Sequence, residues 1–254
     1  MRFRQFAFAA ESLDTAVDDL CTVLGLDVCF RDPGVAKFGL SNALIPLNGN
    51  FLEIVSPTQP DTTAGRYLHR RGGDSGYMII LQCNDALAER ERIKTLGARE
   101  VWRHDEAEAV ATHYHPADVP GAILSIDSMY QGARFHREHS HWRWAGPDWG
   151  EYVRTDRVQA LVGVAIQSDY PAGTAARWSK VLNMPVANSA SGPAIELANA
   201  HIRFIELTDE RGLGIAELDV LPQDRRAIRA AADARGLLCD NGQVELCGLR
   251  VNLI

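Results

Sequence analysis

The sequence lacks the features that mark membrane proteins and nucleic-acid-binding proteins. No apolar run approaches the roughly 20 residues that a membrane-spanning helix needs. The 26 Lys and Arg residues are outnumbered by 33 Asp and Glu residues, which gives a net charge of -7. This balance disfavours nucleic acid and membrane surfaces as partners, because both attract basic patches. The expected partner is a small molecule, and a homodimer is compatible with the sequence.

Paired cysteines are also lacking. The five cysteines are scattered and form no CxxC pair; they are Cys21, Cys29, Cys83, Cys239 and Cys247. An odd, dispersed set indicates reduced thiols, which predicts a cytoplasmic protein. The opening MRFRQFAF alternates in character, so we interpret it as a strand and not as a signal peptide.

What the sequence does contain is a repeated order of elements. The opening strand is followed by a helix that Ser12 caps and Gly25 ends. Strands are then predicted over 26–32, 36–47 and 50–57, with a hairpin turn at Asn48-Gly49. The unit is therefore βαβββ.

The same order returns three times. It begins again at GYMIILQCN, with a helix ended by Gly97, and at LVGVAIQS, with a helix from Pro171 to Leu182. A fourth unit runs from GIAELDVL to the end, and TAVDDLCTVLGLDV in the first unit matches TAARWSKVLNMPV in the third. Residues 131–157 are polar and aperiodic. We predict a domain over 1–130, a linker over 131–157 and a second domain over 158–254.

One stretch carries the clearest chemistry. THYHPADVPGAILSID places His113 and His115 on one face of a predicted strand, and Ser125 and Asp127 on one face of the next. Imidazole and carboxylate groups suit a divalent ion such as zinc, iron or manganese. They equally suit a metal-free acid–base pair. The alternative is that the two histidines lie on an edge strand and face solvent.

The residues also resemble a known superfamily. FRQFAFAAESLDTAVDDLCTVLGLDV is similar to the opening strand and helix of the vicinal oxygen chelate superfamily, and GNFLEIVSP resembles the strand that ends its first module. This superfamily includes glyoxalase I, extradiol dioxygenases, methylmalonyl-CoA epimerase and bleomycin-resistance proteins. The segment from FGLSNALIPL to GYMIILQ looks like uncharacterised glyoxalase-like domain proteins. The resemblance implies an α+β fold of four βαβββ modules, paired into two half-open barrel domains that each surround a cavity.

The resemblance also implies positions for metal ligands, and this chain departs from them. Gln5 stands where the superfamily usually has its first His, and Glu53 stands on the usual Glu position. In the second module the matching positions hold Tyr77 or Met78, and Ser125. Two of the four usual ligands are therefore missing or poor, which puts the standard metal site in doubt.

From the resemblance and the polar stretch together, we predict a site in the first domain. The predicted catalytic residues are Glu53 and His115; the substrate-binding residues are Gln5, Asn42, Ser125 and Trp144; and the metal ligands, if a metal is bound, are Glu53, His113, His115 and Asp127. A tryptophan in the linker closes over an apolar substrate or, in the alternative, only anchors the linker.

Two functions fit these residues. The first is an enzyme of the glyoxalase or dioxygenase type, a metal-dependent lyase, isomerase or dioxygenase that acts on a small oxygenated metabolite in the first domain. The alternative is a non-catalytic protein of the resistance type that binds a small molecule in the same cavity. The second domain has few chemically active residues, and we interpret it as mainly structural.

Overall fold

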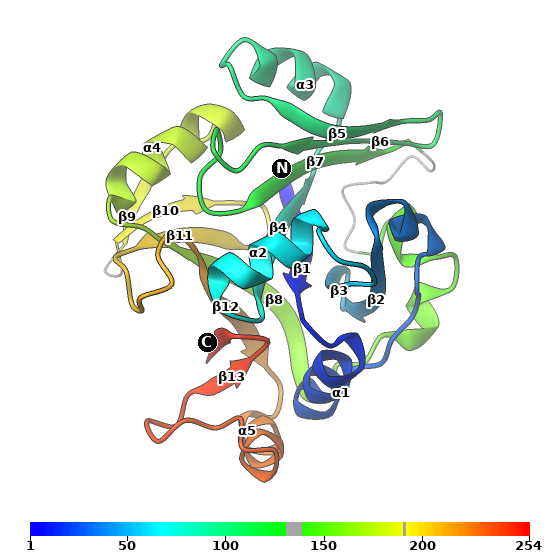
Figure 1. The fold of residues 1–254 in the computed structure, drawn as a ribbon, viewed down its shortest axis with the longest axis vertical. Helices are drawn as coiled ribbons and strands as arrows, with labels where there is room; N and C mark the ends of the chain where they lie inside the picture. Colours follow the sequence, from blue (N-terminus) through cyan, green and yellow to red (C-terminus); the bar gives the residue numbers. More distant parts are fainter. Residues whose placement is uncertain (131–138, 190–191) are drawn as a thin grey trace. The chain divides into compact units, whose positions relative to one another are not determined.

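The computed structural model describes residues 1–130, 139–189 and 192–254 (Figure 1). The helices are α1 (Leu13–Leu24), α2 (Thr63–Arg71), α3 (Ala86–Lys94), α4 (Pro171–Leu182) and α5 (Arg225–Ala234), with 3-10 turns η1 (Pro33–Phe38), η2 (Arg143–Ala145) and η3 (Trp149–Tyr152). The strands are β1 (Arg2–Ala9), β2 (Leu40–Leu47), β3 (Asn50–Pro57), β4 (Ser75–Gln82), β5 (Glu100–Asp105), β6 (Ala109–Tyr114), β7 (Ile123–Met129), β8 (Val158–Gln167), β9 (Ala187–Ser189), β10 (Gly192–Glu196), β11 (His201–Ile205), β12 (Gly214–Pro222), β13 (Val244–Leu246) and β14 (Leu249–Leu253).

The described strands form two mixed sheets. The first has the order β2-β3-β1-β4-β7-β6-β5, and the second has the order β13-β14-β12-β8-β11-β10-β9. The predicted α+β fold of repeated modules is confirmed. Among the described helices, none has the length and apolar character to span a bilayer.

The four modules differ in how complete they are. The second (β4 to β7) and the third (β8 to β11) each contain the full strand, helix and three strands. In the first module the strand predicted over 26–32 is wrong, because only a single bridge from Phe30 to Leu44 forms there. The fourth module is reduced in the same way, to a bridge between Leu238 and Val244. Helix α2 is an addition to the βαβββ order.

Local signals in the sequence set the boundaries of the first module. The Ser12 hydroxyl accepts a hydrogen bond from the Thr15 amide at the start of α1, and Gly25 ends the helix in the left-handed region with φ of 68°. Asn48 and Gly49 both have positive φ, at 44° and 86°, as a two-residue hairpin between twisted strands requires. These predictions are confirmed.

By its contacts the chain divides into two compact units. Unit 1 consists of Met1–Gln5, Tyr77–His141 and Val162–Ala216, and unit 2 consists of Phe6–Gly76, Trp142–Leu161 and Glu217–Ile254. Unit 1 thus holds the two complete modules and unit 2 holds the two reduced ones. The division of the chain into domains 1–130 and 158–254 with a linker between them stays a prediction, and residues 131–138 of that linker lie outside the described part.

Within unit 1, helix α4 fastens the third module to the second. The Trp178 indole donates to the Pro120 carbonyl at 2.8 Å, and the Arg177 guanidinium donates to the Asp118 carbonyl at 2.7 Å. Gly121, in the Pro-Gly turn, has φ of 98°, and any side chain there would collide with Ile166. The turn therefore needs glycine both for its backbone conformation and for close packing.

Within unit 2, α1 packs against α5. The guanidinium of Arg235, which follows α5, is paired with the carboxylates of Asp18 and Asp19 on α1. Two tryptophans of the predicted linker pack on the first module, because the ring of Phe51 lies 6.3 Å from that of Trp142 and 5.0 Å from that of Trp149. Trp142 is fully buried, so in this unit the linker contributes to the core.

Candidate functional site

The strands β5, β6 and β7 present two different faces, and α3 covers one of them (Figure 1). The Arg90 side chain of α3 donates to the Thr112 hydroxyl at 2.7 Å, and the Ala86 amide donates to the Ser128 hydroxyl at 2.9 Å. Thr112 and Ser128 therefore point toward the helix. Side chains alternate along a strand, so His113 and Asp127 point to the opposite face. We call this opposite face the polar face of the second module.

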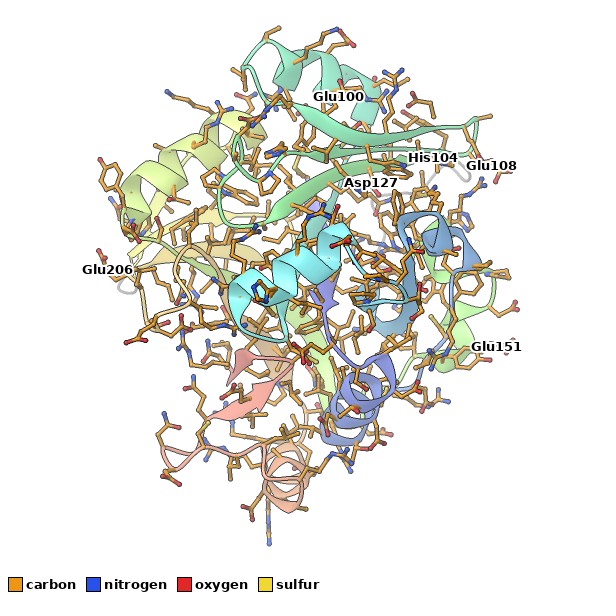
Figure 2. The ribbon with its side chains drawn as sticks, in the orientation of Figure 1. Glu100, His104, Glu108, Asp127, Glu151 and Glu206 are labelled. Atoms are coloured by element: carbon orange, nitrogen blue, oxygen red, sulfur yellow. The ribbon has the colours of Figure 1, made fainter. Side chains whose placement is uncertain are left out.

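The strand register aligns the polar face in rows. In one row, His113 lies opposite Ser125 on β7 and opposite Trp102 on β5. In the next row, the members are His104 on β5, Ala111 on β6, Asp127 on β7 and Gln82 on β4. We call these four residues the His104–Gln82 row. Figure 2 labels His104 and Asp127 on their strands.

Asp127 is the buried carboxylate of this face. Its exposure is 2%, and its Oδ1 accepts a hydrogen bond of 2.5 Å from the Ser125 hydroxyl. Burial of a carboxylate is unfavourable unless donors surround it, and Ser125 supplies one such donor. The sequence-based placement of these two residues on one face is therefore reproduced.

The other end of the polar face is aromatic. The Trp102 ring lies 4.5 Å from the His113 ring and 6.0 Å from the His104 ring, measured between centroids. The His104 side chain is 18% exposed and its Nε2 lies 3.3 Å from a Glu106 carboxylate oxygen. This end is thus partly open to solvent, whereas Asp127 and Gln82 are buried.

Gln82 is a residue that the sequence analysis missed. Its side chain is 2% exposed, and neither the amide nitrogen nor the amide oxygen has a hydrogen-bond partner. The register of β4 against β7 places it beside Asp127, and this pairing could not be read from the segment GYMIILQ alone. The lack of a partner also depends on the tertiary structure and cannot be read from the sequence.

In unit 2, Glu53 is the buried carboxylate of the first module. Its exposure is 8%, and its Oε1 accepts a 2.6 Å hydrogen bond from the Asn42 amide. The Asn42 oxygen in turn accepts a 2.8 Å bond from the Asp32 backbone amide. A chain of hydrogen bonds thus fixes Asn42 and, through it, the orientation of Glu53.

The remaining predicted substrate-binding residues lie in different surroundings. Gln5 on β1 is buried at 2% exposure and belongs to unit 1, whereas Glu53 belongs to unit 2. Trp144 in η2 is half-buried, and its ring packs edge-on against Trp142 at 6.4 Å. This contact is the one expected of a residue that anchors the linker. The predicted roles of Gln5 and Trp144 in binding stay predictions.

His115 lies in a turn, because β6 ends at Tyr114. Its Nδ1 accepts a hydrogen bond of 3.0 Å from the Ala117 amide and lies 3.4 Å from the Arg99 guanidinium. Arg99 also forms a two-bond pair with the Asp118 carboxylate, at 2.6 and 3.1 Å, which lowers the pKa of Asp118 to about 2. The expectation that His115 continues the strand beside His113 is therefore wrong, while its catalytic role stays a prediction.

The predicted metal ligands do not gather into a site within the described residues. No group of three or more His, Cys, Asp or Glu side chains there is arranged to hold a metal ion. His113 contacts Trp102, Asp127 binds Ser125 and His115 binds its own turn. Members of the superfamily commonly use a divalent metal, but this donor set does not fit one, and we assign no step to a metal.

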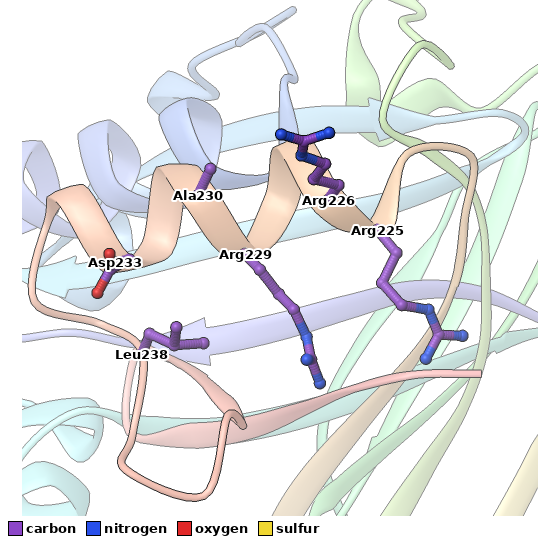
Figure 3. A pocket seen from close by; sticks show the side chains of 6 residues that line it. All are labelled: Arg225, Arg226, Arg229, Ala230, Asp233 and Leu238. Atoms are coloured by element: carbon purple, nitrogen blue, oxygen red, sulfur yellow. The ribbon is translucent and has the colours of Figure 1, made fainter.

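A shallow hollow lies elsewhere in unit 2, along α5 (Figure 3). Its lining includes the exposed side chains of Arg225, Arg226 and Arg229, together with Asp233 and Leu238. None of the predicted site residues lines it.

Comparison with known proteins places the chain in a family. A family model described as "Glyoxalase-like domain" matches residues 6–234. No curated protein shows significant similarity to the chain. A triple variant of 4-hydroxymandelate synthase from Streptomyces coelicolor has a similar structure, with a TM-score of 0.66 at 15% identity over 93% of this chain and 75% of that one.

Smaller structures match about half of the chain. Methylmalonyl-CoA epimerase from Streptomyces coelicolor has a TM-score of 0.46 and 20% identity, covering 51% of this chain and 98% of the epimerase. The Mycobacterium tuberculosis epimerase has a TM-score of 0.45 and 18% identity, covering 50% and 87%. Both the synthase and the epimerase are members of the vicinal oxygen chelate superfamily. The repeated modules and the family match together show that this chain belongs to the glyoxalase-like domain family of the vicinal oxygen chelate superfamily.

Proposed function

We propose that the protein is an enzyme of the glyoxalase or dioxygenase type that acts on a small oxygenated metabolite. The observation that carries this proposal is Glu53, a carboxylate that is buried at 8% exposure and held by the Asn42 amide. A carboxylate in an apolar strand is costly to bury. Its retention on a strand flanked by Leu52 and Ile54 supports a chemical role.

The arrangement around Glu53 suits proton transfer. A general base has to be held in one orientation so that it meets the proton it removes. Asn42 holds one carboxylate oxygen, and the Asp32 backbone amide holds Asn42. In the proposed reaction, Glu53 removes a proton from a carbon or hydroxyl group beside a carbonyl and later returns it.

The test compares two glutamates. Purified protein is incubated with a panel of hydroxy-ketones, 2-oxoaldehydes and catechols, with products followed by mass spectrometry and oxygen consumption by electrode. On a compound that the wild type turns over, Glu53→Gln is expected to lower kcat by about 10²–10⁴-fold, the usual contribution of a general base. Glu91→Gln, on the exposed face of α3, is the matched control and should keep wild-type kcat. Equal activity of Glu53→Gln and the wild type would contradict the role of Glu53.

A second candidate is the non-catalytic binding protein. It is favoured by the absence, within the described residues, of a cluster of three or more metal-binding side chains. Saturable binding of a panel compound without any product would support this candidate over the enzyme. Metal analysis of untagged protein adds an independent result, because a transition metal at near-stoichiometric amounts would contradict our assignment of no metal step.

A further inference from the structure

The hollow along α5 is lined by three arginine side chains (Figure 3). Arg225, Arg226 and Arg229 are exposed, and within the described residues their side chains have no ion-pair or hydrogen-bond partner. Other arginines of unit 2 are paired with carboxylates: Arg154 with Asp27, Arg235 with Asp18 and Asp19, and Arg250 with Glu217. The three positive charges of the hollow are therefore available to a ligand.

Two of these arginines are placed to act together. Arg225 and Arg229 point to the same side of the helix, and Arg226 points away from them (Figure 3). Residues four apart in a helix have their Cβ atoms about 5–6 Å apart, so the first two guanidinium groups can contact one small ligand. A side chain added at Gly242 would lie 3.6 Å from a nitrogen of the Arg229 guanidinium. Arg229 therefore reaches the turn that precedes β13, and the hollow is bordered by α5 on one side and by Leu238 on the other.

The lining of the hollow is positive, although the chain as a whole is negative. Three Arg and one Asp line it, which gives +3 - 1 = +2, whereas the net charge of the chain is -7. The carboxylate of Asp224, beside Arg225, caps α5 by accepting from the Ala227 amide at 2.8 Å. Asp233 follows Arg229 by four residues, at the far end of the row. An anionic group is therefore attracted to Arg225 and Arg229 and repelled from the Asp233 end.

Two neighbouring guanidinium groups favour a phosphate monoester over a carboxylate. A guanidinium binds carboxylate and phosphate oxygens with paired hydrogen bonds. A phosphate monoester has close to two negative charges at neutral pH and three acceptor oxygens, so it can serve both guanidinium groups at once. Leu238, which is half-buried, and the aliphatic parts of the arginine side chains offer an apolar surface beside it. The matching ligand combines a phosphate with an apolar group.

The size of the hollow favours a small molecule over a macromolecule. Its volume of about 500 Å³ lies within the range of small-molecule sites. The positive charge is confined to this hollow, and the net charge of -7 repels nucleic acid and anionic membrane surfaces from the rest of the chain.

We propose that the hollow along α5 binds a small phosphate monoester, with the phosphate between Arg225 and Arg229 and an apolar group against Leu238. All of the lining residues belong to unit 2. The inference goes beyond the proposed function, because it gives these residues no part in turnover. It is tested by binding alone, so its failure would leave the role of Glu53 untouched.

The experiment uses phenyl phosphate as the probe, with phenol, inorganic phosphate and a short phosphoserine peptide as comparisons. Binding to the full chain is measured at neutral pH and low salt by calorimetry and by ligand-observed NMR. Wild-type protein is expected to bind phenyl phosphate saturably. Phenol and inorganic phosphate should bind at least about tenfold more weakly, since phenol lacks the charge and inorganic phosphate lacks the apolar ring.

Three results with the wild type would overturn the proposal. The first is no binding of phenyl phosphate. The second is equal affinity for inorganic phosphate, which would show an adventitious ion only. The third is tighter binding of the phosphoserine peptide than of phenyl phosphate, which would show that the hollow serves a phosphorylated protein instead of a small molecule.

Three matched variants distinguish a defined site from general attraction to a basic helix. Arg225→Gln and Arg229→Gln are each expected to weaken phenyl phosphate binding by about tenfold or more, because each removes a charged donor. Arg226→Gln removes the same charge from the same helix, but its guanidinium points away, so affinity should fall by less than about threefold. All three variants should keep the wild-type Tm, because these side chains are exposed and unpaired. An equal loss of affinity in all three, or unchanged affinity in Arg225→Gln and Arg229→Gln, would contradict the site.

Discussion

At the scale of single residues, His115 has a structural contact that the sequence did not predict. Its Nδ1 accepts from the Ala117 amide within the turn that follows β6. His115→Ala removes that acceptor and is expected to cost about 1 kcal/mol, or roughly 2–4 °C in Tm for a chain of this size. His115→Asn keeps an acceptor at nearly the same place and should retain the Tm.

The same two variants test the predicted catalytic role. If His115 serves only the turn, both variants keep ligand binding and turnover. If it belongs to the site, both lose them, and the asparagine variant does so with an unchanged Tm. Thermal melting and binding measured on the same samples decide between the two roles.

Asp118, in the same turn, gives a prediction about pH. Its hydrogen bonds with Arg99 lower the pKa of the carboxyl to about 2, below the ordinary value of about 3.9. Because the pKa is lower in the folded state, the contribution of this pair is fully present above about pH 4 and is lost as the pH falls toward 2. In an NMR titration of the side-chain carboxyl, Arg99→Gln should raise the pKa of Asp118. Arg229→Gln on exposed α5 should leave it near 2, and a low pKa that survives in Arg99→Gln would contradict the assigned cause.

At the scale of elements, α3 is attached to its sheet by a buried arginine. Arg90 is 5% exposed, and it donates to the Thr112 hydroxyl, the Asp105 carboxylate and the Ala111 carbonyl. Apart from Arg90, only Ala86 and Ile93 of this helix are buried, so hydrogen bonds replace much of the usual apolar stripe. Together with the bond from the Ala86 amide to Ser128, the Arg90 side chain holds this helix against β6 and β7.

Arg90→Met is therefore expected to be strongly destabilising, by about 2–4 kcal/mol, because it leaves buried acceptors without donors. Lys94→Met changes an exposed residue of the same helix and should alter the free energy of unfolding by less than about 0.5 kcal/mol. Chemical denaturation of both variants measures the difference. Similar stabilities for the two variants would show that α3 is held by other contacts.

The elements also show what a sequence can predict. Ser12, Gly25 and the Asn48-Gly49 turn were readable because caps and turns depend on a few neighbouring residues. The strand over 26–32 was predicted wrongly because pairing is a tertiary event, and only Phe30 forms a bridge. A strand without a long partner stays irregular, whatever its composition.

The candidate site was predicted in part for the same reason. Alternation placed Ser125 and Asp127 on one face, and their hydrogen bond agrees with that. Asn42 and Glu53, predicted as separate site residues, proved to be hydrogen-bonded to each other. Gln82 was missed, because the sequence pattern of a glutamine at the end of a strand is the same whether or not its amide is hydrogen-bonded. The amide of Gln167, at the end of β8, is hydrogen-bonded to Thr208 in a loop, whereas the amide of Gln82 has no hydrogen-bond partner. The difference lies in a loop more than 40 residues away along the chain.

At the scale of the whole molecule, the repeated modules gave the fold class, and the two sheets of β1–β7 and β8–β14 follow the order of the chain. The compact units could not be predicted, since each combines modules from both halves of the sequence. Nothing in the repeats indicates which modules share a core. Which modules pack together depends on tertiary contacts, such as the hydrogen bond from Trp178 to the Pro120 carbonyl, which joins the third module to the second.

The composition of unit 2 has a consequence for synthesis on the ribosome. Helix α1 is ion-paired with Arg235. The N-terminal module therefore lacks this contact until Arg235, more than 200 residues later in the chain, has been translated. Unit 1 draws most of its residues from the middle of the chain, 77–141 and 162–216, and can condense earlier because its contacts are closer in sequence. During that interval the first module exposes the surface that α5 later covers, and it is then the part of the nascent chain that most needs protection from aggregation.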